Sequence, residues 1–153
     1  MRCRSAPTLE FMTSVLGYEV VGEAANRTRV AAGGNSAGHV IDVVEDPEAT
    51  PAVNGLGTVH HVAMAIATGE EQRRLQAELL ELGYGVTDVM DRQYFQSIYF
   101  REPGGVLFEV ATIGPGFTVD EELALLGRDL KLPPWEEQYR AAIETNLPSV
   151  VYR

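Results

Sequence analysis

Two adjacent histidines, His60 and His61, stand out because the whole chain of 153 residues has only three histidines. They open the segment HHVAMAIA, whose alternating small and large apolar residues predict a β-strand. Successive side chains of a strand point to opposite faces, so His61 would share a face with Ala63 and Ala65, and His60 with larger residues. We therefore predict that His61 faces space for a ligand, that His60 packs, and that the two rings do not bind one ion. A hydrogen-bonded core histidine remains the alternative.

Glu109 is the second residue that could do chemistry. It lies between Phe108 and Val110 in the apolar segment VLFEVA. An ionised carboxylate in such a strand is costly unless it is paired or bound to a metal. A salt bridge or an edge position would explain an isolated glutamate. A histidine in the first strand of the same unit favours a metal ion held by His61 and Glu109, whereas His39, in NSAGHV, is expected in a loop or at a strand end.

The elements that must position these residues fall into two similar halves. Apolar spacing predicts a helix over 7–16 and another over 69–82. The strands are predicted in YEVVGE, NRTRVAAGG, GHVIDVVE, TVHHVAMAI, GYGVTDVM, QYFQSIYFRE and GVLFEVAT, with a tight turn at Pro103-Gly104-Gly105.

An internal repeat relates the halves. Leu-Gly-Tyr at 16–18 recurs at 82–84, and the same offset places 40–44 on 106–110. The repeat unit is a strand, a helix and three strands. By this offset the opening strand of the first unit would precede Met1, so we expect that unit to lack it. Val43 falls on Glu109, which predicts no second metal site.

The chain is therefore predicted to be an α+β protein of paired βαβββ modules with two C-terminal helices. We assign 1–46 to an incomplete first module, 47–56 to a linker, 57–112 to the second, ligand-bearing module and 113–153 to a helical tail. In the tail, TVDE at 118–121 predicts a capping box. A stripe of Trp135, Tyr139, Ile143 and Leu147 predicts a helix that docks on the sheet, or one that closes the site or forms a dimer contact.

The charge and cysteine content of the chain indicate which partners and which cellular compartment to expect. The net charge of −10 argues against a nucleic acid or an anionic membrane as partner. The single cysteine, Cys3, permits no disulfide within the chain, which favours the cytoplasm. We find no signal-peptide pattern and no apolar run near the ~18 residues that span a bilayer.

Several segments together resemble one family. HHVAMAIA, RQYFQSIYFREPGGVLFEVAT, GPGF, VDEELALLG, LKLPPW and IETNLP are similar to the C-terminal half of ring-cleaving, hydroquinone-type extradiol dioxygenases. These belong to the vicinal oxygen chelate (glyoxalase/bleomycin resistance) superfamily. The resemblance runs from about residue 8 to 149, and it implies paired βαβββ modules that curve around a metal, usually Fe(II), with Mn(II), Zn(II) or Ni(II) as alternatives.

Residue by residue, the resemblance implies that His61 and Glu109 are two of the three ligands of a two-histidine, one-carboxylate site. It implies catalytic roles beside the metal for His60, Arg92 and Tyr99, acting on a small aromatic substrate and O₂. A satisfied strand aromatic is the alternative for Tyr99, and a solvated turn residue for Arg92. The family's third ligand, a histidine in the first of four modules, has no match here, which would impair the activity.

Three functions follow from this combination. The first is ring-cleaving dioxygenase activity on hydroquinone- or catechol-like aromatics. The second is non-redox binding of a small molecule by the same fold. The third is a glyoxalase-like metal lyase or isomerase, which ranks last because only one carboxylate is placed. An unpaired sheet edge where the opening strand is expected to be missing also favours association, so we predict a homodimer.

Overall fold

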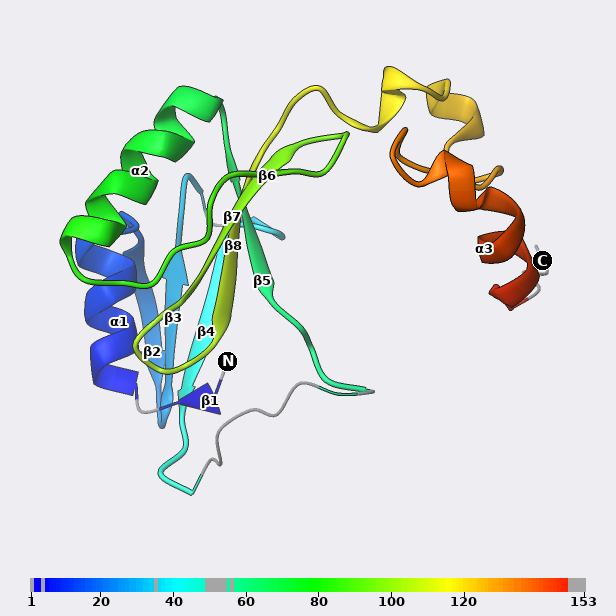
Figure 1. Ribbon diagram of the computed structural model, residues 1–153. Helices are drawn as coiled ribbons and strands as arrows, with labels where there is room; N and C mark the ends of the chain where they lie inside the picture. Colours follow the sequence, from blue (N-terminus) through cyan, green and yellow to red (C-terminus); the bar gives the residue numbers. More distant parts are fainter. Residues whose placement is uncertain (1, 4, 35, 49–54, 56, 149–153) are drawn as a thin grey trace.

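The computed structural model describes residues 2–3, 5–34, 36–48, 55 and 57–148 (Figure 1). Two four-stranded sheets, each accompanied by a helix, are followed by a tail that extends away from them. The first module comprises β1 (Arg2–Cys3), α1 (Ser5–Ser14), β2 (Glu19–Ala24), β3 (Arg27–Ala31) and β4 (Val40–Glu45). The second comprises β5 (Val62–Ile66), α2 (Gly69–Glu81), β6 (Met90–Asp91), β7 (Gln96–Arg101) and β8 (Leu107–Thr112).

The two sheets have the same topology, which confirms the repeat. Their strand orders are β1-β4-β3-β2 and β5-β8-β7-β6. In each sheet the opening strand pairs parallel to the last strand of its module, and the remaining pairs are antiparallel. A parallel pair needs a crossover, and α1 and α2 supply it.

The first module has an opening strand, although the sequence repeat predicted that this strand would be missing. It is short but present: Arg2 pairs with Val44 and Cys3 with Glu45. The sequence offset failed here because α1 follows β1 more closely than α2 follows β5. The predicted strand in GYGVTDVM is also reduced, to β6 and an isolated bridge between Val86 and Phe100. Most of the predicted linker at 47–56 lies outside the described residues.

Helix α2 begins with a capping box, in which two side chains accept hydrogen bonds from free backbone amides of the first turn. Thr68 is the N-cap, with the Glu71 amide donating to its hydroxyl and the Thr68 amide donating to the Glu71 carboxylate. This capping box was not recognised in the sequence. The helix ends before Gly83, whose φ of +86° suits glycine.

One hydrophobic core serves both modules. Phe11 of α1 packs edge-on against Phe100 of β7, with ring centroids 5.8 Å apart. Thr8, also on α1, donates to the Glu102 carboxylate at 2.7 Å. Both are almost fully buried, and Glu102 further accepts from the amides of Gly104 and Val106. Helix α1 thus fixes the first module against the second, and the Glu102 carboxylate already accepts three hydrogen bonds.

The tail contains 3₁₀ turns η1 (Phe117–Val119), η2 (Leu123–Leu125) and η3 (Glu137–Tyr139), followed by α3 (Arg140–Asn146). The capping-box prediction was wrong, because Thr118 lies inside η1 and no α-helix follows it there. The docking prediction was also wrong: Trp135 and Tyr139 are about half exposed (48% and 55%) and α3 stands away from the sheets (Figure 1). No helix among the described residues is long and apolar enough to cross a membrane.

Candidate metal centre

His61 and Glu109 meet at the start of β5. Nε2 of His61 lies 2.8 Å from Oε2 of Glu109. The pairing of Ala63 with Glu109 holds the histidine, two residues earlier, beside the carboxylate. The alanine side chain is small enough to leave this approach open.

The other oxygen of Glu109 is held by two hydroxyl groups. Ser97 Oγ donates to Oε1 at 2.5 Å and the Tyr99 hydroxyl donates to it at 2.7 Å. Tyr99 pairs directly with Glu109 across β7 and β8, and Ser97 lies two residues away on the same face. Ser97 is fully buried and Glu109 is 4% exposed. Neutral donors orient the carboxylate without cancelling its charge, so Oε2 remains directed at His61.

The structure corrects the prediction for His60. Strand β5 begins at Val62, so neither histidine is in the strand and alternation does not separate them. Their Nδ1 atoms lie 2.8 Å apart, with the rings nearly perpendicular. One of these nitrogens must donate and the other accept. His61 therefore contacts Glu109 through one nitrogen and His60 through the other.

Arg92 and Tyr99 extend this cluster. Arg92, in the turn after β6, directs Nη2 at the Tyr99 hydroxyl at 3.4 Å. Its guanidinium carbon lies 5.5 Å from the centroid of the Tyr99 ring, within cation–π range. The structure thus places His60, Arg92 and Tyr99 around the His61–Glu109 pair. Sequence reasoning missed Ser97, although alternation in QSIYFR puts it on the same face as Tyr99.

His39 lies apart from this cluster. It is exposed in the loop before β4, and its Nδ1 lies 3.0 Å from the Ala32 carbonyl oxygen. It lines a cavity of about 850 Å³ between the modules, whose walls are otherwise mostly apolar and include Ile41, Val62 and Met64. Ala63 lines the same cavity and pairs with Glu109, so the cavity borders the strand pair that carries Glu109.

The donor set fits part of a metal site. Two donors in adjacent positions, each ~2.1 Å from an ion, are separated by roughly 3 Å, close to the distance between His61 and Glu109. One imidazole and one carboxylate belong to the ligand set of non-haem iron. Within the described ranges, no group of three His, Cys, Asp or Glu residues converges. These residues therefore fit two positions of a coordination shell and leave the others open.

The corresponding position of the first module holds Asp42 rather than Val43, which corrects the sequence offset. Asp42 and Glu109 each lie three residues before the last parallel pair of their sheets. Val43 instead faces the core. Asp42 accepts from Arg29 Nε at 2.6 Å and from Arg27 Nη1 at 2.7 Å. Hydrogen bonds from Arg29 and then Arg27 hold the pKa of Asp42 well below its ordinary value.

The fold described above is that of a known superfamily, and comparison with known proteins agrees. The family model for the glyoxalase/bleomycin resistance protein/dioxygenase superfamily matches residues 3–110, and the chain belongs to this superfamily. The chain is 43% identical over 143 residues to "Putative ring-cleaving dioxygenase MhqE" of Bacillus subtilis, covering 94% of this chain and 46% of that protein. It is 40% identical over 129 residues to "Chlorohydroquinone/hydroquinone 1,2-dioxygenase" of Sphingobium indicum, covering 81% and 39%.

The fold is also similar to that of solved structures. The crystal structure of a "putative dioxygenase" from Bacillus subtilis superimposes with a TM-score of 0.85 at 39% identity, covering 96% of this chain and 47% of that chain. A glyoxalase/dioxygenase from Nostoc punctiforme, at 15% identity and a TM-score of 0.61, shares the fold. The chain thus spans less than half the length of the ring-cleaving relatives that it matches.

Proposed function

We propose that this chain carries the metal-binding part of an Fe(II)-dependent dioxygenase that cleaves hydroquinone- or catechol-like rings. The observation that carries the proposal is the convergence of His61 Nε2 and Glu109 Oε2. The names of the relatives, a ring-cleaving dioxygenase and a hydroquinone dioxygenase, support the ring-cleaving activity and the hydroquinone class. Mn(II), Zn(II) or Ni(II) could occupy the same donors.

His61 and Glu109 would hold the metal, which supplies electrons for O₂ activation and a Lewis acid for an ionised substrate oxygen. A ligating imidazole nitrogen must be unprotonated. His61 would then carry its proton on Nδ1 and donate it to His60, which fixes the ring. Ser97 and Tyr99 would fix Glu109 through its other oxygen.

The polar groups beside the pair would act on the substrate. The Tyr99 hydroxyl is held between Glu109 and Arg92, so it can exchange a proton with a phenolic oxygen placed next to it. The exposed guanidinium of Arg92 would stabilise a phenolate or the negative charge that develops during ring opening. A full site requires a third protein donor or solvent in the open positions, and activity with two protein ligands would be impaired.

The cavity beside β5 favours a second function, the non-redox binding of a small apolar molecule. Its volume of about 850 Å³ and its mostly apolar lining are typical of sites for ligands of drug size. Binding there would not need the metal.

Oxygen uptake distinguishes the two functions. Protein loaded anaerobically with Fe(II) is mixed with hydroquinone, chlorohydroquinone or catechol, and O₂ and aromatic absorbance are followed. We expect both to fall together and Glu109→Gln to abolish the change. Stoichiometric iron without O₂ uptake on any of the three substrates would count against the dioxygenase. Calorimetric binding of these aromatics that is unaffected by EDTA would favour the binding protein.

A further inference from the structure

The cavity between the modules is an unfilled continuation of the hydrophobic core. Val110 of β8 belongs to the buried core, and its neighbour Met64 on β5 lines the cavity with it. Ile41 of β4, Leu16 of the turn after α1 and Leu75 of α2 face the same space. Except for Val110, these side chains pack against the core and yet stay only half-buried. Protein interiors leave few voids, so an opening of about 850 Å³ among core side chains is suited to the body of a ligand.

This cavity is separate from the metal centre. Successive side chains of a strand point to opposite faces. Met64 and Val110 pair on the face toward the cavity, so the next pair, Ala63 and Glu109, directs its side chains to the other face of the same two strands. The metal-centre residues are not among the described residues that line the cavity. The two sites therefore lie on opposite faces of β8.

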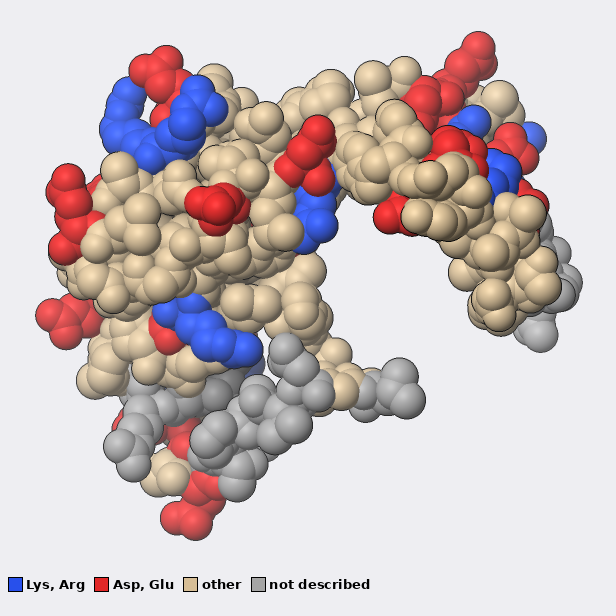
Figure 2. Space-filling model, viewed as in Figure 1, with Lys and Arg blue, Asp and Glu red and all other residues tan. Residues whose placement is uncertain are grey.

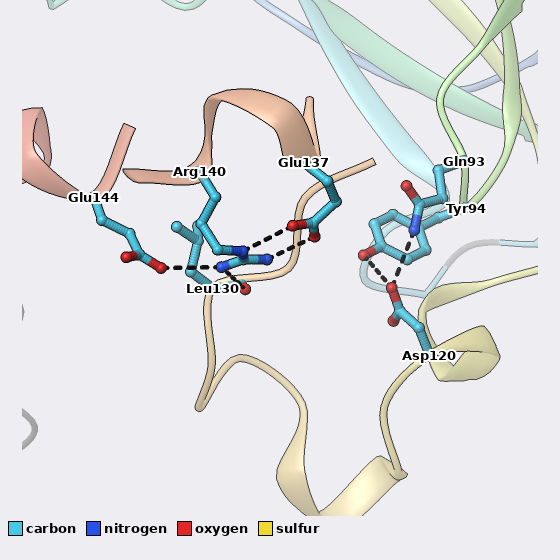
Figure 3. A network of polar contacts seen from close by, with 7 residues as sticks. All are labelled: Gln93, Tyr94, Asp120, Leu130, Glu137, Arg140 and Glu144. Atoms are coloured by element: carbon cyan, nitrogen blue, oxygen red, sulfur yellow. Dashed lines mark hydrogen bonds and ion pairs between the residues drawn. The ribbon is translucent and has the colours of Figure 1, made fainter. Parts of the chain in front are cut away.

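The C-terminal tail does not close the cavity. Figure 2 shows open space between the modules and most of the tail. The tail is fixed at its start, where Asp120 accepts from the Tyr94 hydroxyl at 2.9 Å and from Gln93 Nε2 at 3.1 Å (Figure 3). No residue of 113–148 is among the described lining residues. A small molecule can therefore reach the cavity without displacing the tail.

His39 supplies a hydrogen-bond acceptor at the rim of the cavity. Its Nδ1 lies 3.0 Å from the Ala32 carbonyl oxygen, and the Ala32 amide donates to the His39 carbonyl oxygen at 3.0 Å, which holds the residue in place. A carbonyl oxygen only accepts, so Nδ1 carries the hydrogen and Nε2 of the neutral ring is an acceptor. Nε2 has no hydrogen-bond partner among the described residues. It is therefore available to a ligand hydroxyl.

Tyr18 is the other described lining residue whose side chain forms ordinary hydrogen bonds. It is half-buried, and burial raises the pKa of its phenol, so the hydroxyl stays protonated and can donate at neutral pH. No charged side chain is among the described lining residues. A charged ligand would thus lose its hydration without gaining a counter-ion.

We propose that this cavity binds a neutral phenol or aromatic alcohol, with its ring among the apolar side chains and its hydroxyl donating to His39 Nε2. An aromatic body is favoured because the Tyr18 ring and the Met64 thioether both make favourable contacts with aromatic rings. The proposal rests on the second function given above, non-redox binding, and names the class of ligand. Hydroquinones belong to this class, so they would bind here without a metal.

Three two-ring probes test the ligand class. Equilibrium dialysis of the metal-free chain in EDTA, at about pH 8 where an ordinary imidazole is neutral, measures binding of 2-naphthol, naphthalene and 2-naphthoate. We expect naphthalene to bind about 3–10-fold more weakly than 2-naphthol, because it lacks one hydrogen bond. The anion 2-naphthoate should bind about 10-fold more weakly than 2-naphthol, or worse, because its charge is unpaired.

Paired variants locate the site. Ile41→Trp fills the cavity and should abolish binding of 2-naphthol, whereas Val20→Trp, on an exposed residue of β2 outside the cavity, should leave it unchanged. His39→Leu, on the exposed rim, should keep the affinity for naphthalene and remove the preference for 2-naphthol. Circular dichroism confirms that each variant is folded.

The outcomes separate this proposal from the functions on which it builds. Equal affinity for 2-naphthol and naphthalene, or an unchanged preference in His39→Leu, overturns the ligand class and leaves apolar binding in place. No binding of any probe overturns the binding function as well. Loss of 2-naphthol binding in Glu109→Gln but not in Ile41→Trp would assign the phenol to the metal centre and overturn the second site. Oxygen uptake with Fe(II) tests the dioxygenase independently of all three results.

Discussion

The two modules share one topology and differ in what lies at the same place in the sheet. Asp42 of β4 and Glu109 of β8 occupy equivalent positions, opposite Arg29 and Tyr99 respectively. The side chain of Asp42 is 19% exposed and bonded to two arginines, whereas Glu109 is buried among hydroxyl groups and one imidazole.

This difference shows why only the second module is suited to a metal. An acid already neutralised by fixed guanidinium groups gains little from a further cation, and its arginines repel one. A buried carboxylate with neutral donors keeps its charge and lacks a strong counter-ion, so it favours a cation. Asp42 and Glu109 occupy equivalent strand positions, so it is the neighbouring side chains, not the position, that make a carboxylate available to a metal ion.

The largest expected effect comes from removing the buried carboxylate. Glu109→Gln should lower Fe(II) or Zn(II) affinity by at least about 100-fold, above the 10–100-fold range of outer residues, because it removes the anionic ligand. Competition with a chromogenic chelator measures this. Asp42→Asn is the matched change in the first module and should leave metal affinity unaltered. Equal losses in both variants would remove the distinction between the modules.

Ser97→Ala should have the next largest effect. It leaves Glu109 Oε1 with the single donor Tyr99, so the carboxylate is less well oriented, and metal affinity should fall about 10–100-fold. The same chelator competition applies. Thr28→Ala, on the corresponding strand β3, is the control and should not change affinity. Unchanged affinity in Ser97→Ala would mean that Tyr99 alone orients the glutamate.

Thr8→Ala tests the contact that joins the modules. It removes a buried hydrogen bond to the Glu102 carboxylate and should lower the free energy of unfolding by about 1.5–3 kcal/mol. Urea denaturation measures this. Thr13→Ala, on the same helix, removes only a bond within α1 and should cost less. Metal affinity should stay the same, since Glu102 is separate from the site.

The smallest effect concerns the ion pairs of Asp42. Its folded pKa is lowered, so its contribution to stability is present above the ordinary carboxyl pKa of 3.8 and is lost as the pH falls through the lower folded value. The melting temperature of the wild type should slightly exceed that of Asp42→Asn at pH 7, and the gap should close in acid. A gap that widens below pH 3.8 would contradict the assigned direction. Both arginines are about half exposed, so the effect should also weaken in salt.

Much of the fold could be predicted from the sequence. Periodicity located α1, α2 and β7 within a few residues, since apolar spacing reflects which face is buried. The repeat gave the matching topology of the sheets. The tail was predicted less well: the spacing of Trp135 and Tyr139 indicated a docked helix, but a pattern cannot show whether a docking surface lies within reach. Ser97 was missed because its role depends on a partner in another strand.

The sequence by itself determined the duplicated module and the importance of Glu109, because these depend on local periodicity and on a residue type that an apolar strand tolerates only with a partner. The superfamily and the pairing of His61 with Glu109 followed from the resemblance of several segments to a known family. The tertiary structure decided that His60 lies beside His61, that Asp42 rather than Val43 corresponds to Glu109, and that the tail stands apart. Strand ends, sheet register and contacts between distant segments arise from the packing of the whole chain, and no local pattern encodes them.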